Sequence, residues 1–257
     1  MAPRRFLALM IFAGAALGGC ATTDEAKTSN DPFEPVNRVM FTANHYVDKY
    51  VGVPVAEVYV HVIPKPARRG IHNVLLNLGS PVTLGNDILQ GSPDRALQTF
   101  YRFGVNSTLG IGGLFDIASA SGVPGHSEDF GQTLGVYGVG EGPYLVLPLV
   151  GPSPPRDLAG HFVDVFMDPL YYMDFNGRHA LLVGRHAAGL VDGRAQAITE
   201  IKMLDNSLDP YVAARSAYRQ HRDNEIRNGV PDVSHLPDIN DVPTSGDGIL
   251  TPIHVKP

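Results

Sequence analysis

The single cysteine of this chain, Cys20, limits what the rest of the sequence can become. It follows directly after the residues Leu-Gly-Gly, and two arginines and a short apolar run lie upstream. A charged start, a short apolar stretch and small residues before the cut are typical of a secretory signal. A cysteine at that cut is the lipobox pattern of bacterial lipoproteins. The sequence therefore predicts that Cys20 is the acylated first residue of the mature chain, rather than a chance cysteine near an ordinary signal.

The predicted lipid anchor also fixes the compartment and removes one source of stability. The apolar run is shorter than the roughly 20 residues that a spanning helix needs, whereas two acyl chains anchor a protein stably. Ala21 follows the cysteine where an aspartate favours retention in the inner membrane. We therefore expect an outer-membrane protein, lipid-anchored in the inner leaflet and facing the periplasm. Because Cys20 has no second cysteine, stability must come from packing or from the membrane.

The low charge content agrees with either a membrane-embedded protein or a soluble domain. Charged residues make up 18% of the chain, below the ~25% of ordinary soluble domains. A protein that buries part of its surface in acyl chains has such a composition, but so does a soluble domain with a large core. The net charge of −6 argues against a nucleic-acid partner.

The sequence divides into four parts: a signal peptide (1–19), a lipidated tether (20–30), a helical domain (31–228) and a disordered or draped tail rich in Pro and Asp (229–257). The domain opens with Asp31 and Glu34, spaced as a capping box. Apolar residues then recur every three or four positions up to Val51, which predicts an amphipathic helix. Its apolar face can cover an ordinary core or lie in a membrane interface.

Further helices are predicted from proline and cap positions. The stretch 54–62 can be strand or helix. Residues 179–205 can form one helix, or two that meet near Gly189 or Gly193. The remaining helices are expected at 67–78, 81–89, 93–106, 157–166 and 210–227.

Glycines are dense between residues 109 and 142, which predicts hinges and tight loops. Their spacing lacks a phosphate-loop pattern. His126 and Ser127 stand beside two acids, but neighbouring residues rarely converge on one reacting atom, and no nucleophile-elbow motif is present. The histidines show no metal-ligand spacing. We therefore expect no enzyme, no catalytic set, no metal and no cofactor.

An ordered set of motifs resembles the MlaA family of bacterial lipoproteins and covers about residues 30 to 228. The motifs are NDPFEPVNRVMF (30–41), PKPARRG (64–70) with Asn73, NSTLGIGG (106–113) with Phe115-Asp116, DFGQTLGVYGVG (129–140), GPY (142–144), Leu147-Pro148, Arg156-Asp157, Asp209-Pro210-Tyr211 and Ala217-Tyr218.

The resemblance implies a fold and a function. The fold is all-α, a ring-shaped bundle of amphipathic helices around a central channel with a glycine-rich hairpin loop. The function is phospholipid transport: such a protein, embedded in the inner leaflet beside a trimeric outer-membrane porin, removes phospholipids from the outer leaflet. It passes them to the periplasmic carrier MlaC and so maintains lipid asymmetry.

The resemblance also suggests site residues. The segment with Tyr137, Gly138, Gly140 and Gly142 corresponds to a gate loop beside the channel, and Arg185 to a channel cation. Two alternatives stay open at this stage. One is a structural envelope lipoprotein scaffolded on a porin, and the other is a phospholipid-cleaving enzyme.

Overall fold

A computed structural model describes residues 30–230, and these residues are almost entirely helical. Cys20, the predicted signal peptide and nearly all of the predicted tether and tail lie outside the described residues. The first described helix, α3 (Glu34–Val47), passes through a π-helical turn, η2 (Asp48–Gly52), into α4 (Val53–Val62). The ambiguous stretch 54–62 is therefore a helix, since α3 and η2 lead into it without a break.

The predicted capping box does not form. Phe33 stands at the N-cap of α3, and no side chain caps the helix there. Asp31 is instead fully buried, where its carboxylate accepts hydrogen bonds from Asn37, Tyr211 and Arg215. The local spacing predicted a helix cap wrongly, because residues far along the chain bind this carboxylate.

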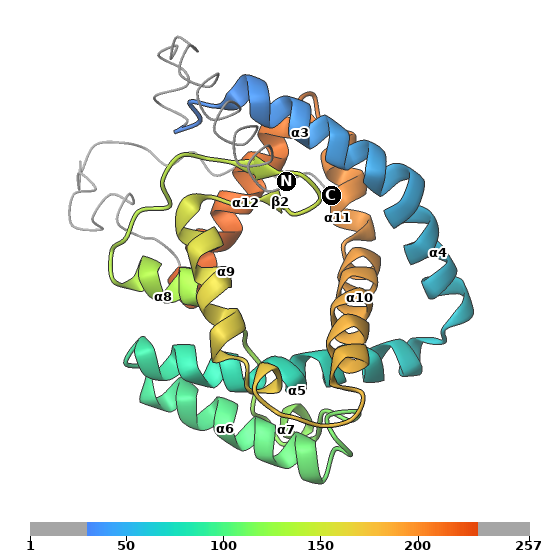
Figure 1. Cartoon of the computed structure of the whole chain (residues 1–257), viewed down its shortest axis with the longest axis vertical. Helices are drawn as coiled ribbons and strands as arrows, with labels where there is room; N and C mark the ends of the chain where they lie inside the picture. Colours follow the sequence, from blue (N-terminus) through green and yellow to red (C-terminus); the bar gives the residue numbers. More distant parts are fainter. Residues whose placement is uncertain (1–29, 231–257) are drawn as a thin grey trace, which may run out of the picture.

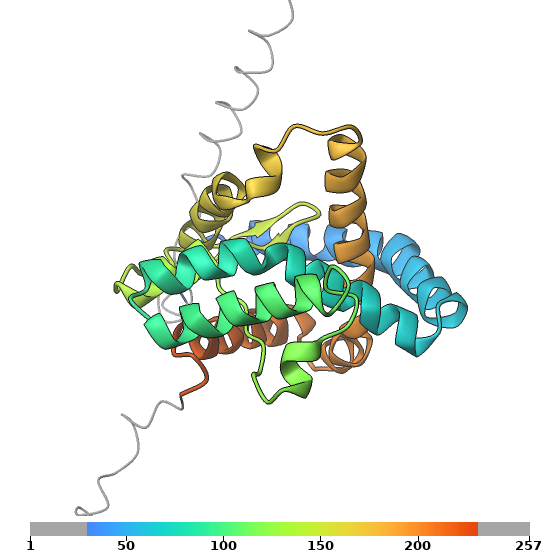
Figure 2. The same cartoon turned by 90° about the horizontal axis from the view of Figure 1, so that it is seen from below.

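The predicted helices 67–78 and 81–89 are one helix, α5 (Lys65–Leu89), with Pro81 inside it. A Ser-Pro pair often starts a helix, but here the preceding turn continues through it. Ser80 Oγ donates to Leu76 O at 3.2 Å. Helix α6 (Pro93–Thr108) packs along α5, and Figure 2 shows the two side by side. This packing outweighs the local preference for a break.

The second half of the domain contains shorter elements and three more long helices. The stretch 179–205 is indeed two helices, but they meet at Ala197 rather than at Gly189 or Gly193. The elements are α7 (Ile117–Ala120), α8 (Phe130–Val136), β1 (Val146–Leu147), β2 (Gly151–Pro152), α9 (Pro155–Met167), η3 (Pro169–Tyr171), α10 (Arg178–Gln196), α11 (Ile198–Asp205) and α12 (Pro210–Ile226).

These helices are arranged as a ring (Figure 1). Helices α3 and α4 form one side of the ring, α5 runs along its base, and α9 and α10 lie on opposite sides of the ring. The start of α12 returns to α3, where Arg215 pairs with Glu34, and this contact closes the ring. The all-α, ring-shaped arrangement that the resemblance implies is thus confirmed.

The hairpin follows the glycine-rich loop rather than containing it. Strand β1 pairs antiparallel with β2, with Val146 opposite Pro152. Two asparagines of α3, spaced seven residues apart, fix β1 and the turn that follows it. Asn37 donates to Tyr144 O and accepts from Val146 N, and Asn44 binds Leu147 O and Leu149 N in the same way.

Burial is inverted relative to a soluble protein. Among residues 30–230, sixteen polar or charged residues are buried but only six apolar ones. Large apolar side chains are exposed on many helices, including Leu97 and Phe100 on α6 and Phe162 and Phe166 on α9, each at least 64% exposed. None of the described helices is both long and apolar enough to cross a membrane. Large apolar side chains of the ring are therefore exposed, while polar contacts join its helices.

Candidate functional site

Ion pairs between helices hold the ring together. On α12, Arg222 Nη1 donates to Asp129 Oδ2 at 2.7 Å and Nη2 donates to Asp157 Oδ1 at 3.0 Å. Burial alone raises the pKa of both carboxyls, but the bonds from Arg222 and other donors outweigh it and hold both pKa values below the ordinary value. Both carboxylates therefore stay charged and bind α12 to α8 and α9.

A second polar cluster lies between α5, α6 and the loop before α8. His126 Nε2 lies 3.0 Å from Asp87 Oδ1, and the ligand atoms of Asp87, His126 and Glu128 all lie within 4.8 Å of one another. Sequence spacing did not reveal this group, because its members come from distant segments. Arg95 and Gln90 already bind the Glu128 carboxylate. The cluster is a paired polar network rather than a set of vacant ligands.

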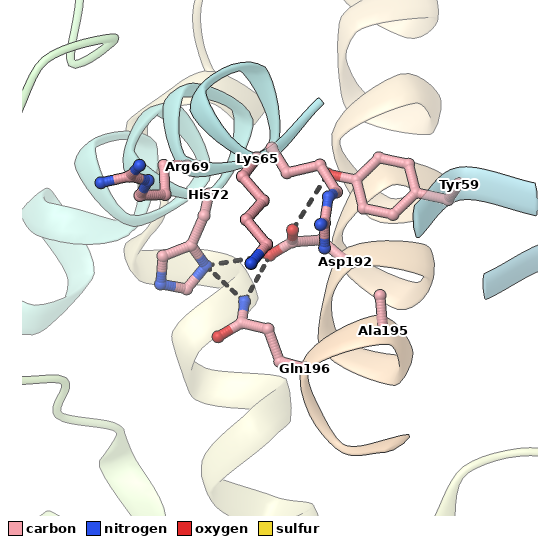
Figure 3. Close-up of a pocket in the computed structure, with 8 residues that line it drawn as sticks. Tyr59, Lys65, Arg69, His72, Asp192, Ala195 and Gln196 are labelled. Carbon is pink, nitrogen blue, oxygen red and sulfur yellow. Dashed lines mark hydrogen bonds and ion pairs between the residues drawn. The ribbon is translucent and has the colours of Figure 1, made fainter. Parts of the chain in front are cut away.

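A basic pocket of about 310 Å³ lies where α4, α5 and α10 meet (Figure 3). Its lining joins the end of α4, the first turns of α5 and the C-terminal half of α10. The lining residues are Tyr59, Lys65, Arg68, Arg69, His72, Asp192, Ala195 and Gln196.

The only acid of this lining, Asp192, is already bound by neutral or weakly basic groups. The Tyr59 hydroxyl donates to Asp192 Oδ1 at 3.1 Å, and Gln196 Nε2 donates to Oδ2 at 2.7 Å. His72 Nδ1 lies 2.9 Å from the same oxygen Oδ2. Burial, together with the bond to Asp192, raises the pKa of Tyr59 to about 12, so its hydroxyl remains a donor at neutral pH.

The predicted gate loop is tied down at both ends. The Tyr137 hydroxyl donates to Leu89 O at the end of α5 (2.6 Å), and Asn30 Nδ2 donates to Gly142 O (2.7 Å). Gly138 and Gly142 have φ of +81° and +79°, which glycine adopts readily. Between these ends the residues Gly138 and Gly140 are exposed, and a Cβ added at either would meet no neighbour. Its role as a gate stays a prediction.

The predicted channel cation, Arg185, lies on α10 and pairs with Asp168 at 2.5 Å. Its side chain is 18% exposed, and it reaches toward α5, where a Cβ added to Gly79 would lie 4.0 Å from Arg185 Nη2. Its charge is thus compensated within the ring. Arg185 as the channel cation remains a prediction.

Sequence reasoning missed the basic pocket. It used the segment 64–70 only for its resemblance to a family. The signal was present in the sequence, since three cations stand within five residues without an acid among them. What the sequence could not show is that α10 brings Asp192 and Gln196 against this segment.

These features define a class: an all-helical ring with exposed apolar side chains and ion-paired polar contacts between its helices. The chain belongs to the MlaA lipoprotein family, whose sequence pattern matches residues 29–225.

Two relatives carry the name "Intermembrane phospholipid transport system lipoprotein MlaA". The protein from Haemophilus influenzae is 35% identical over 237 residues, which cover 89% of this chain and 94% of that protein. The protein from Escherichia coli K12 is 38% identical over 83% of this chain and 85% of its own length.

A solved structure from work on the "Structural basis for maintenance of bacterial outer membrane lipid asymmetry" superimposes with a TM-score of 0.69. The two sequences are 38% identical, and the matched region covers 76% of this chain and 98% of the solved chain. The fold and the family thus agree over most of the described residues.

Proposed function

We propose that this protein moves phospholipids between membranes and thereby maintains the lipid asymmetry of the outer membrane. It removes phospholipids that have strayed into the outer leaflet and passes them to the periplasmic carrier MlaC. The names of its relatives and of the similar structure support this role. We place it in the inner leaflet, facing the periplasm and beside a trimeric porin.

The inverted burial is the observation that carries this proposal. In water, the exposed apolar side chains would cost about 25 cal/mol for every Å² left uncovered. Acyl chains remove that cost, so the outer face of the ring suits a leaflet. Charged contacts within the ring suit a wetted path, because an unpaired charge buried in lipid costs several kcal/mol.

The proposed mechanism is a sliding step without bond breaking. The phospholipid headgroup passes through the opening of the ring, while its acyl chains stay in apolar surroundings. The loop at Tyr137–Gly142 gates this passage. No step requires a nucleophile or a metal, and the protein acts as a conduit rather than as an enzyme.

The test measures phospholipid on the cell surface. Cells that lack this protein should label more phosphatidylethanolamine with a membrane-impermeant amine reagent, and a plasmid copy should reverse the increase. Unchanged labelling in cells that lack the protein would contradict the proposal. A protein that restores asymmetry but never carries phospholipid or transfers it to the carrier would instead be a scaffold on the porin. Lysophospholipid produced by purified protein would indicate a hydrolase.

The predicted lipidation of Cys20 has its own test. Cys20→Ser removes the acylation site, so the variant should leave the outer-membrane fraction when envelopes are separated by density. If the variant still reached the outer membrane, the lipobox would matter less than the apolar surface of the ring.

A further inference from the structure

We infer that the basic pocket at the start of α5 binds the phosphodiester group of a phospholipid. The inference rests on the proposed function and names where the headgroup is held. The pocket volume, about 310 Å³, is at the small end of the range for ligand sites, and it suits a headgroup rather than a whole lipid.

Three cations of this pocket lack an acidic partner among the described residues. Lys65, Arg68 and Arg69 all line it, and no described carboxylate forms an ion pair with them. Arg68 Nε donates only to the carbonyl of Ile63, at 3.1 Å. Asp192, the acid within reach, has both oxygens engaged by Tyr59, His72 and Gln196, as described above. Positive charge is thus left over in a protein whose net charge is −6.

The position of these cations on α5 makes their unpaired positive charge unfavourable when no anion is bound. Helix α5 has 25 residues, no acid in its first turn and no side-chain cap at its start. The N-terminus of a helix is positively polarised, so cations there are disfavoured and anions are favoured. Lys65 opens the helix and Arg68 follows one turn later. An anion would relieve both the unpaired cations and the uncapped helix.

The surface next to the pocket indicates that the anion belongs to a lipid. Val55, Val58 and Val62 lie along α4 and are 45%, 62% and 68% exposed. Helix α4 ends at Val62, and Pro64 stands at the N-cap of α5 directly before its basic first turn. An apolar stripe that leads to a cationic pocket matches an amphiphile with acyl chains and a phosphodiester. Free phosphate would use the pocket but not the stripe.

The experiment uses the purified full chain in a non-ionic detergent and three probes. Dihexanoyl phosphatidylglycerol, inorganic phosphate and dihexanoyl glycerol are titrated by calorimetry. The first should bind with an affinity that falls as salt rises. Inorganic phosphate should bind at least tenfold more weakly, and the uncharged lipid should bind more weakly than the phospholipid. Equal affinities for phosphate and phospholipid would overturn the lipid assignment in favour of a free-phosphate site.

Variants distinguish binding in the pocket from an effect of the protein's overall charge. Lys65→Glu should weaken phosphatidylglycerol binding about tenfold, as expected when a charge-assisted hydrogen bond is lost. Lys65→Arg keeps the charge and should retain binding. Lys202→Glu, at an exposed lysine of α11, makes the same charge change elsewhere and should have little effect. Equal binding by the wild type and Lys65→Glu would overturn the pocket.

The outcomes for the pocket and for the proposed function are distinguishable. If the wild type and Lys65→Glu bind phosphatidylglycerol equally, and the wild type restores asymmetry in cells, the pocket alone is ruled out. Protein that binds phosphatidylglycerol through Lys65 but fails to restore asymmetry supports the pocket and contradicts the transport role.

Discussion

At the scale of single residues, Arg222 is a buried cation that pairs with three carboxylates. Its guanidinium binds Asp129, Asp157 and Glu225, and only a tenth of its side chain is exposed. Removing one partner of a buried ion pair leaves the other charge uncompensated. Arg222→Met should therefore lower the free energy of unfolding by about 3 kcal/mol, measured by denaturant titration in detergent. Asn224→Ala, at an exposed position of the same helix, should change it by less than about 0.5 kcal/mol. Equal losses would show that the pairing is not what stabilises α12.

The same carboxylates predict how stability depends on pH. Their pKa values are lower in the folded protein than the usual unfolded value of about 3.9. Their contribution is therefore fully present above that value and is lost as the pH falls through the folded pKa. The free energy of unfolding should drop below about pH 4. Asp157→Asn should flatten this drop while lowering stability at neutral pH. A variant with an unchanged acid slope would contradict the assignment.

The residue scale is also where sequence reasoning was weakest. Spacing marked Asp31 as a helix cap, but its partners Tyr211 and Arg215 lie about 180 residues away. Asp87 and His126 likewise meet only in the folded ring. In a protein that buries mainly polar residues, the role of such a residue depends on partners distant in the sequence. A local sequence pattern does not reveal these partners.

At the scale of elements, the loop after α8 gives the sharpest test. Gly138 has a φ of +81° and its Cβ position faces no neighbour. Gly138→Pro cannot adopt that φ, whereas Asn tolerates it. Gly138→Pro should impair phospholipid removal and leave the protein in the membrane, and Gly138→Asn should be close to wild type. The measurement is surface labelling of phosphatidylethanolamine. Normal asymmetry with Gly138→Pro would exclude gating by this loop.

Elements were the level that the sequence predicted best. Helices at 93–106, 157–166 and 210–227 lie close to the observed α6, α9 and α12, because proline and cap signals agree there with the packing. The signals failed at Pro81 and at the α10–α11 junction. At Pro81 the helix continues along α6, and α10 runs past both glycines to end before Ala197.

At the scale of the whole molecule, the outer apolar surface should determine membrane association. Leu97 and Phe100 are 66% and 64% exposed on α6. Changing both to Glu places charges where acyl chains are proposed to lie, at a cost of several kcal/mol per charge. The double variant should leave membranes under a urea wash that retains the wild type. Gln98→Glu, on the same helix, is the control and should stay bound. If both proteins stayed equally, α6 would not face lipid.

The overall shape followed from resemblance, not from the residues themselves. Composition favoured neither a lipid-facing surface nor a soluble domain with a large core. It counts apolar residues but does not show where they lie in the fold. Helical periodicity has the same limit, since an apolar stripe looks alike whether it faces a core or a membrane. Only the fold shows that the α3 asparagines bind the segment at β1, and that Val47 of α3 and Val51 of η2 stay exposed.

The inverted burial has a consequence for biogenesis. A soluble chain collapses in water around its apolar residues and delivers a finished surface to its destination. This ring has little apolar material to collapse around, and in water its outer face would attract other copies of itself. At the proposed location, such a chain would need an escort across the periplasm and would complete its folding where lipid is available. Its refolding yield in aqueous buffer should rise steeply once detergent micelles are present.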